Sequence, residues 1–62
     1  MEWIDITKEI PSVEGKYLVQ TKTLMGNTHR VDAICSLKQD KGTLKAHFNV
    51  NNQIVTHWLK EK

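Results

Sequence analysis

Apolar and polar residues alternate along much of this chain with the two-residue period of a β-strand. The most regular run spans residues 44–50, where Leu44, Ala46, Phe48 and Val50 alternate with Lys45, His47 and Asn49. Residues 29–37 repeat the pattern, with Val31, Ala33, Cys35 and Leu37 at the apolar positions. Successive side chains of a strand point to opposite faces of the sheet. Both runs therefore predict strands that bury one face and expose the other.

Two further runs have the composition of strands. Residues 16–24 (KYLVQTKTL) and residues 53–59 (QIVTHWL) are rich in β-branched and aromatic residues. Turn signals separate the four runs, at Met25-Gly26-Asn27, at Gln39-Asp40-Lys41-Gly42 and at Asn51-Asn52. Strands joined by loops this short are most simply antiparallel neighbours. The pattern predicts a mainly β fold, a small and strongly twisted antiparallel meander of four strands.

The N-terminal segment, residues 3–13, follows a different pattern. Ile6 and Ile10 are four residues apart, which suits one turn of helix. Pro11 ends such a turn, because a proline pushes the residue before it into extended geometry. We expect a short extended piece, at most one helical turn, and a loop up to Gly15. This segment is expected to pack over one face of the sheet.

The last hairpin decides which side chains reach the core, because a shift of one residue exchanges the two faces of a strand. A two-residue loop at Asn51-Asn52, which asparagine favours, places His57 on the face of Phe48 and sends Trp58 to the other face. A shift of one residue in the pairing brings Trp58 onto the Phe48 face instead. The pattern favours the first arrangement and leaves the second open.

The 62 residues form one domain, residues 1–62, with a small core. Its one cysteine, Cys35, excludes an intramolecular disulfide, and the cysteine and histidine spacings of a structural zinc site are absent. Stability must therefore come from apolar packing. The residues expected to carry it are Trp3, Pro11, Phe48, Val55, His57 and Trp58. Trp3 and Trp58 are near opposite ends of the chain, and we expect contact between them to hold the ends together.

The histidines and the cysteine could act in catalysis, but they are not arranged as in a catalytic site. The side chains that titrate near neutral pH are His29, His47 and His57. His47 and His57 are expected to lie near each other across the last hairpin, without a third metal ligand. Cys35 is expected on the buried face of its strand, where a thiol is a poor nucleophile. Because a domain this small has little room for a pocket of ~300 Å³ or more, we expect no enzymatic activity, cofactor or metal site.

Nine basic and seven acidic residues give a net charge of +2, a weak basic bias. On the polar side of the sheet, the candidates for contact with a protein partner are Lys22, Arg30, Lys45, His47 and Asn49. A solvated sheet face has the same composition. The alternative is a nucleic-acid-binding module that uses Lys22, Arg30, Lys38, Lys41 and Lys45.

The sequence gives no sign of export or of a membrane span. No apolar run approaches the ~20 residues that cross a bilayer. The acidic residues Glu2, Asp5 and Glu9 interrupt the apolar stretch that a signal peptide needs. The protein is expected to be soluble and to stay in the cytoplasm of the cell that makes it.

The two ends of the chain carry a family pattern. Trp3-Ile4-x-Ile6-x-x-x-Ile10-Pro11-x-x-x-Gly15 is followed by Tyr17-Leu18-Val19, and Val55-Thr56-His57-Trp58 stands near the C-terminus. In this order they resemble the bacterial and phage family catalogued as domain of unknown function 551, whose members open on W-I-x-V-x-x-x-L-P and close on V-T-H-W. The chain departs from that family in residues 59–62, which lack its proline-rich tail, and in a middle region poor in aromatic residues.

The resemblance implies a phage or prophage origin and brings no known activity with it. Together with the missing catalytic set, it indicates a small binding module that acts on a protein partner, such as a host factor or a defence component that it inhibits. The alternatives are the nucleic-acid-binding module and a homo-oligomeric component of the virion or of its assembly.

Overall fold

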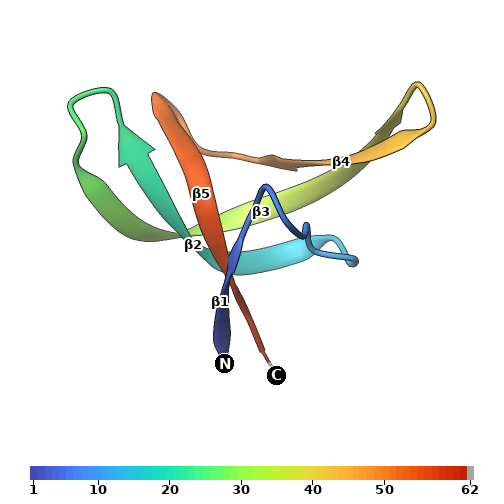
Figure 1. Cartoon of the computed structure of the whole chain (residues 1–62), viewed down its shortest axis with the longest axis horizontal. Coiled ribbons are helices and arrows are strands. Elements are labelled where there is room, and N and C mark those ends of the chain that lie inside the picture. The colour runs from blue at the N-terminus through green and yellow to red at the C-terminus, as the bar shows by residue number, and fades with distance from the viewer. Residues whose placement is uncertain (62) are drawn as a thin grey trace.

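The computed structural model describes residues 1–61, and in them the chain forms one antiparallel sheet of five strands (Figure 1). The strands are β1 (Glu2–Asp5), β2 (Gly15–Thr23), β3 (Thr28–Asp40), β4 (Thr43–Phe48) and β5 (Gln53–Lys60). They lie in the order β1-β5-β2-β3-β4. The prediction of a mainly β fold is confirmed. None of the described residues belongs to a helix long and apolar enough to cross a membrane.

Strands β2, β3 and β4 form the predicted meander around the long strand β3. Strand β2 pairs with β3 from Thr28 to Cys35, and β4 pairs with it from Cys35 to Asp40. The β2–β3 and β3–β4 turns therefore lie at opposite ends of the molecule (Figure 1). The loop between β3 and β4 consists of Lys41 and Gly42, whose positive φ angles of 52° and 78° suit a type I′ turn.

The pairing of β5 differs from the prediction. This strand pairs with β2 on one side and with β1 on the other, and not with β4. Asn52 adopts the left-handed conformation (φ 58°) expected for the Asn51-Asn52 turn, but the chain leaves β4 there instead of folding back along it. The central position gives β5 hydrogen-bonding partners along both edges, whereas a hairpin with β4 would leave one edge unpaired. The four-stranded meander is therefore wrong for this strand.

The N-terminal segment also enters the sheet. Its first residues form β1 instead of covering a face, and Asp5 ends that strand opposite His57. The expected turn follows directly, since the backbone N–H groups of Lys8 and Glu9 both donate to the Asp5 carbonyl, at 2.9 and 3.2 Å. The Asp5 carboxylate accepts hydrogen bonds from the Thr7 hydroxyl (2.7 Å) and the Thr7 N–H (2.9 Å). These bonds favour the charged form and lower the pKa of Asp5.

The core lies on one face of the sheet, which we call the inner face. Its buried apolar side chains are Val19, Ala33, Cys35, Phe48 and Trp58. Pro11, from the N-terminal loop, and Thr21 are also fully buried, and Val55 is half-buried against the cluster. Cys35 lies on the buried face as predicted, and burial raises the pKa of its thiol.

Trp58, and not His57, faces the core. The register of β5 against β2 shifts between Gln20 and Thr21, where β5 has one extra residue. This bulge leaves Trp58 opposite Val19 on the inner face and His57 opposite Gln20 on the outer face. The favoured hairpin register is therefore wrong, because β4 does not set the register of β5.

The two tryptophans lie on opposite faces of the sheet. Ile4 pairs with Trp58, so the neighbouring Trp3 points to the outer face. The expected contact between Trp3 and Trp58 is wrong, and the β1–β5 pairing joins the two ends of the chain instead. On the inner face, Trp58 meets the Tyr17 ring at 5.5 Å between centroids, nearly perpendicular. On the outer face, the Arg30 guanidinium lies 4.9 Å from the centre of the Trp3 ring.

Candidate protein-binding surface

Strand β4 is one edge of the sheet, and its pairing with β3 determines which of its backbone groups face outward. Residues of an antiparallel pair alternate between bonding to the partner strand and pointing away from it. The Asn49 N–H donates to the Ile34 carbonyl at 3.2 Å, so the alternate residues toward the turn, such as Lys45, also bond to β3. The N–H and C=O groups of Leu44 and Ala46 therefore point away from β3. Within residues 1–61, no other strand pairs with β4.

Asn49 ends this strand. Its side-chain Oδ1 accepts a hydrogen bond from the Ile34 N–H at 2.7 Å, so the side chain and backbone of Asn49 together complete one more step of the ladder. The Val50 N–H then donates to the Phe48 carbonyl at 2.9 Å. Asn49, a candidate for partner contact, is thus engaged in the fold. The free edge runs from Leu44 to the N–H of Phe48.

A groove runs beside this edge on the inner face. Its volume is about 320 Å³, and its lining residues are Ile6, Ala46, His47, Phe48, Val50, Gln53 and Val55. Ile6 follows β1 and Val55 belongs to β5, so the groove lies between the two margins of the curved sheet. Five of its seven lining residues are apolar, and His47 and Gln53 are polar. Ala46, one of the lining residues, also has outward-facing backbone groups.

The described residues border other surface hollows of comparable size, of about 370 and 270 Å³. The expectation that so small a domain has little room for a hollow of ~300 Å³ is therefore wrong. The reason is the shape of the sheet, which curves without closing (Figure 1). A curved open sheet leaves concave space that a compact core of the same length would fill.

The outer side of the β4 edge is basic. In the β3–β4 pairing, Lys45 lies opposite Lys38, and His47 lies opposite Ser36. The Lys45 Nζ is 3.7 Å from an Asp40 carboxylate oxygen, but these side chains are 65% and 59% exposed. An exposed ion pair of this kind holds its partners weakly. The edge thus has a groove with mostly apolar lining residues on one side and exposed positive charge on the other.

The residues expected to form one contact surface are divided between two places. Lys45, His47 and Asn49 belong to the β4 edge. Lys22 lies near the β2–β3 turn, and Arg30 packs on the tryptophan ring of the outer face. Because the two turns lie at opposite ends of the molecule (Figure 1), these residues do not make one patch.

The basic set of the nucleic-acid alternative is divided in the same way. Lys38 and Lys45 lie opposite each other, and Lys41 is in the turn that joins their strands. Lys22 and Arg30 lie on the strands of the other hairpin. The lysines of the β3–β4 hairpin therefore form the denser basic group.

The structure also shows an apolar group that the alternation pattern did not single out. Leu24 and Met25, in the β2–β3 turn, are 96% and 87% exposed, and Ile54 is 67% exposed. Leu24 and Ile54 border the hollow of about 270 Å³. Leu24 is expected at the end of the strand of residues 16–24, but β2 ends at Thr23 and Leu24 lies in the turn. The signal in the sequence is two large apolar residues directly before Gly26 and Asn27.

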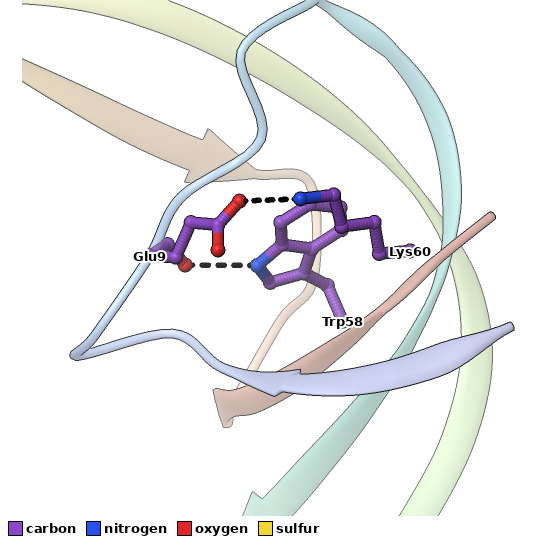
Figure 2. Close-up of polar contacts among 3 residues, drawn as sticks. All are labelled: Glu9, Trp58 and Lys60. Carbon is purple, nitrogen blue, oxygen red and sulfur yellow. Dashed lines mark hydrogen bonds and ion pairs between the residues drawn. The ribbon is translucent and has the colours of Figure 1, made fainter. Parts of the chain in front are cut away.

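The opposite margin of the sheet is held by side chains. Figure 2 shows Trp58 and Lys60 of β5 meeting Glu9 of the N-terminal loop. The Trp58 Nε1–H donates to the Glu9 carbonyl at 2.9 Å, and the Lys60 Nζ donates to the Glu9 carboxylate at 3.0 Å. These two bonds fasten the loop beside the buried Trp58 ring.

The histidines lie apart. His47 is on β4 and His57 is on β5, and these strands do not pair, so their expected proximity across a hairpin is wrong. The His57 Nδ1 lies 3.0 Å from the Thr56 hydroxyl oxygen. Among residues 1–61, no three or more histidine, cysteine, aspartate or glutamate side chains are grouped so that they could hold a metal ion.

No family model matches the chain, and neither a curated protein nor a solved structure matches it. The geometry of the β4 edge therefore supplies the argument for function.

Proposed function

We propose that the protein is a non-enzymatic binding module that takes an extended segment of a protein partner onto the free edge of β4. The observation that carries this proposal is the position of the Leu44 and Ala46 backbone groups, which point away from the sheet beside an apolar groove. A strand added to such an edge forms main-chain hydrogen bonds with it and places alternate side chains in the neighbouring groove.

Two contributions support binding at this edge. The outward-facing N–H and C=O groups of Leu44 and Ala46 offer main-chain hydrogen bonds, each worth about 0.5–1.5 kcal/mol net. The groove adds apolar burial, at about 25 cal/mol for each Å² removed from water. The hydrogen bonds fix the direction and register of the added segment, and the groove selects its side chains.

The family pattern at the two ends of the chain supports a phage or prophage origin within the family catalogued as domain of unknown function 551. In this proposal the partner is a host protein, such as a defence component, which the module inhibits by occupying one of its extended segments. The neighbouring genes test the origin. Phage genes on either side support it, and a locus far from any mobile element contradicts it.

The substitution Ala46→Pro tests the binding site. Proline removes an N–H that points away from β3, so it leaves the β3–β4 ladder intact. Ala46→Ser keeps that N–H and is the matched control. Capture of a partner from host lysate should be lost with Ala46→Pro and kept with Ala46→Ser, while both variants give the circular dichroism spectrum of the parent. Equal capture by the two folded variants would contradict strand addition at β4.

A further inference from the structure

We infer that the segment bound by β4 alternates apolar and acidic side chains, and that it belongs to a partner protein rather than to a second copy of this chain. The inference rests on the proposed function and specifies the occupant of the same site. Its basis is the surroundings that each face of the added strand would meet, and the charges on the two edges of the sheet.

The inner side of the added strand meets apolar surface. A strand bonded to Leu44 and Ala46 continues the sheet, so its inward side chains lie next to those of β4. There they approach Phe48, which is 7% exposed, and the half-buried Ile6 and Val55, all of which line the groove. Apolar side chains suit this position, because contact with these three side chains removes apolar surface from water.

The outer side of the added strand meets positive charge. Its outward side chains lie beside Lys45 and His47, with Lys38 one strand further in. Residues 35–48 contain three lysines and one carboxylate, Asp40, whose contact with Lys45 is exposed. Glu14, which precedes β2, accepts the Leu37 N–H at 2.8 Å on the far edge of β3. Acidic side chains on the added strand would pair with these lysines across adjacent strands.

A second copy of this chain fits the edge poorly. Pairing β4 with the β4 strand of another copy would bring Lys45 and His47 next to the same residues of that copy. Like charges on adjacent strands destabilise the pairing, and a lysine in an edge strand is a common protection against self-association. The edge is therefore unfavourable for its own sequence and favourable for an acidic one.

The same segment would bind less favourably at the other edge of the sheet. Strand β1 contains Glu2 and Asp5 among its four residues. Asp5 points to the outer face, so the acidic side of a strand beside β1 would meet this like charge, whereas beside β4 it meets lysines. Charge therefore directs the segment to β4.

Two synthetic peptides test the inference, one alternating valine with glutamate and the other alternating valine with lysine. Each is N-methylated along one edge, so that it offers a single edge for pairing. Titrated into ¹⁵N-labelled protein at low salt, the Val/Glu peptide should shift the amide signals of Leu44, Ala46 and Phe48. It should bind about tenfold more tightly than the Val/Lys peptide, the value for two exposed charge pairs. High salt should reduce this preference, because it screens exposed charges.

The double variant Lys38→Glu/Lys45→Glu is the matched reversal. Both side chains are exposed on the outer face, so the variant should fold, and its preference should change to the Val/Lys peptide. Equal binding of both peptides at β4 overturns the inference and leaves the proposed function standing. The inference is also overturned if neither peptide shifts the amide signals of β4. Shifts of the β4 amides on concentrating the protein alone also overturn it, because the occupant is then a second copy. The proposed function fails separately, if Ala46→Pro captures the partner as well as Ala46→Ser does.

Discussion

The two edges of the sheet differ in whether their outward-facing N–H and C=O groups are already hydrogen-bonded. Beside β1, the Ile6 N–H donates to the Thr56 carbonyl at 2.9 Å, so by alternation Trp3 and Asp5 have the outward-facing groups. The Asp5 carbonyl is already used by the N–H groups of the following turn. Strand β1 therefore leaves little for a partner to pair with, whereas β4 leaves its outward-facing groups free along most of its length.

The side chains make the contrast stronger. Beside β1, the N-terminal loop is fastened to β5 through Glu9, which accepts hydrogen bonds from Trp58 and Lys60 (Figure 2). Beside β4, the ion pair is the exposed contact between Lys45 and Asp40, and the groove stays open. One margin of the sheet supplies stability and the other is available for binding. Loss of the buried Trp58 at the first should therefore unfold the protein, and substitutions that remove only the outward-facing groups of β4 should change binding alone.

The largest effect is expected at the closed margin, from Trp58→Ala. Trp58 is 3% exposed, and removing a buried tryptophan costs about 3–5 kcal/mol. That is about as much as a core of this size supplies, so the variant should be unfolded at room temperature by circular dichroism. The control is Trp3→Ala on the outer face, where the ring is half-buried, and this variant should remain folded. A folded Trp58→Ala beside an unfolded Trp3→Ala would reverse the roles of the two faces.

The next effect separates two neighbouring positions of β4. Lys45→Pro removes an N–H that bonds to β3, whereas Ala46→Pro removes one that faces outward. The lost bond leaves a β3 carbonyl without its donor, which should make Lys45→Pro about 1–3 kcal/mol less stable than Ala46→Pro. Urea denaturation measures the difference as a lower midpoint for Lys45→Pro. A lower midpoint for Ala46→Pro would mean that the alternation along β4 is the reverse of the one described. Matching midpoints would contradict the loss of a β3–β4 hydrogen bond in Lys45→Pro.

The sequence predicts the local part of this fold and misses the part that depends on strand order. Alternation along residues 29–37 and 44–50 identifies β3 and β4, because a two-residue period is a local property. The partner of β5 is not local. The Asn51-Asn52 turn takes its left-handed conformation whichever way the chain continues, and the pattern says nothing about the bulge that turns Trp58 inward.

The residues of the candidate binding site could likewise be predicted from the sequence only in part. Lys45 and His47 stand out in the sequence as polar residues of an alternating strand, and they do lie on the outer side of the edge. Asn49 has the same pattern, yet its side chain bonds to the backbone of Ile34. The pattern also cannot show that β4 is an edge strand, because that follows from β5 pairing with β2 and β1.

Alkaline pH should weaken the core beside the open edge, through Cys35. This thiol lies opposite Phe48 on β3, and burial, with a smaller effect from Glu14, raises its pKa above the usual 9.0. In the unfolded chain the thiol ionises near pH 9.0 while the folded chain keeps its proton, so this contribution to stability is complete below pH 9.0 and is lost as the pH rises through the folded pKa. Urea midpoints across that range should fall more for the parent than for Cys35→Ala. The other groups that titrate there are common to both proteins. If the urea midpoints of the two proteins fall in parallel with pH, Cys35 is not the cause of the fall.

Acid should act on the other edge, with the smallest effect of the set. The hydrogen bond from the Thr7 hydroxyl, followed by that from the Thr7 N–H, lowers the pKa of Asp5 below its usual 3.8. The stabilisation by the charged carboxylate is therefore complete above pH 3.8 and is lost as the pH falls through the lower folded pKa. In an NMR titration, the Thr7 amide signal should move in that acid range while the Ala46 amide stays in place, because no carboxylate within residues 1–61 is bonded to the β4 backbone. In Asp5→Asn the Thr7 amide should no longer respond, and a response that persists would assign the titration to another group.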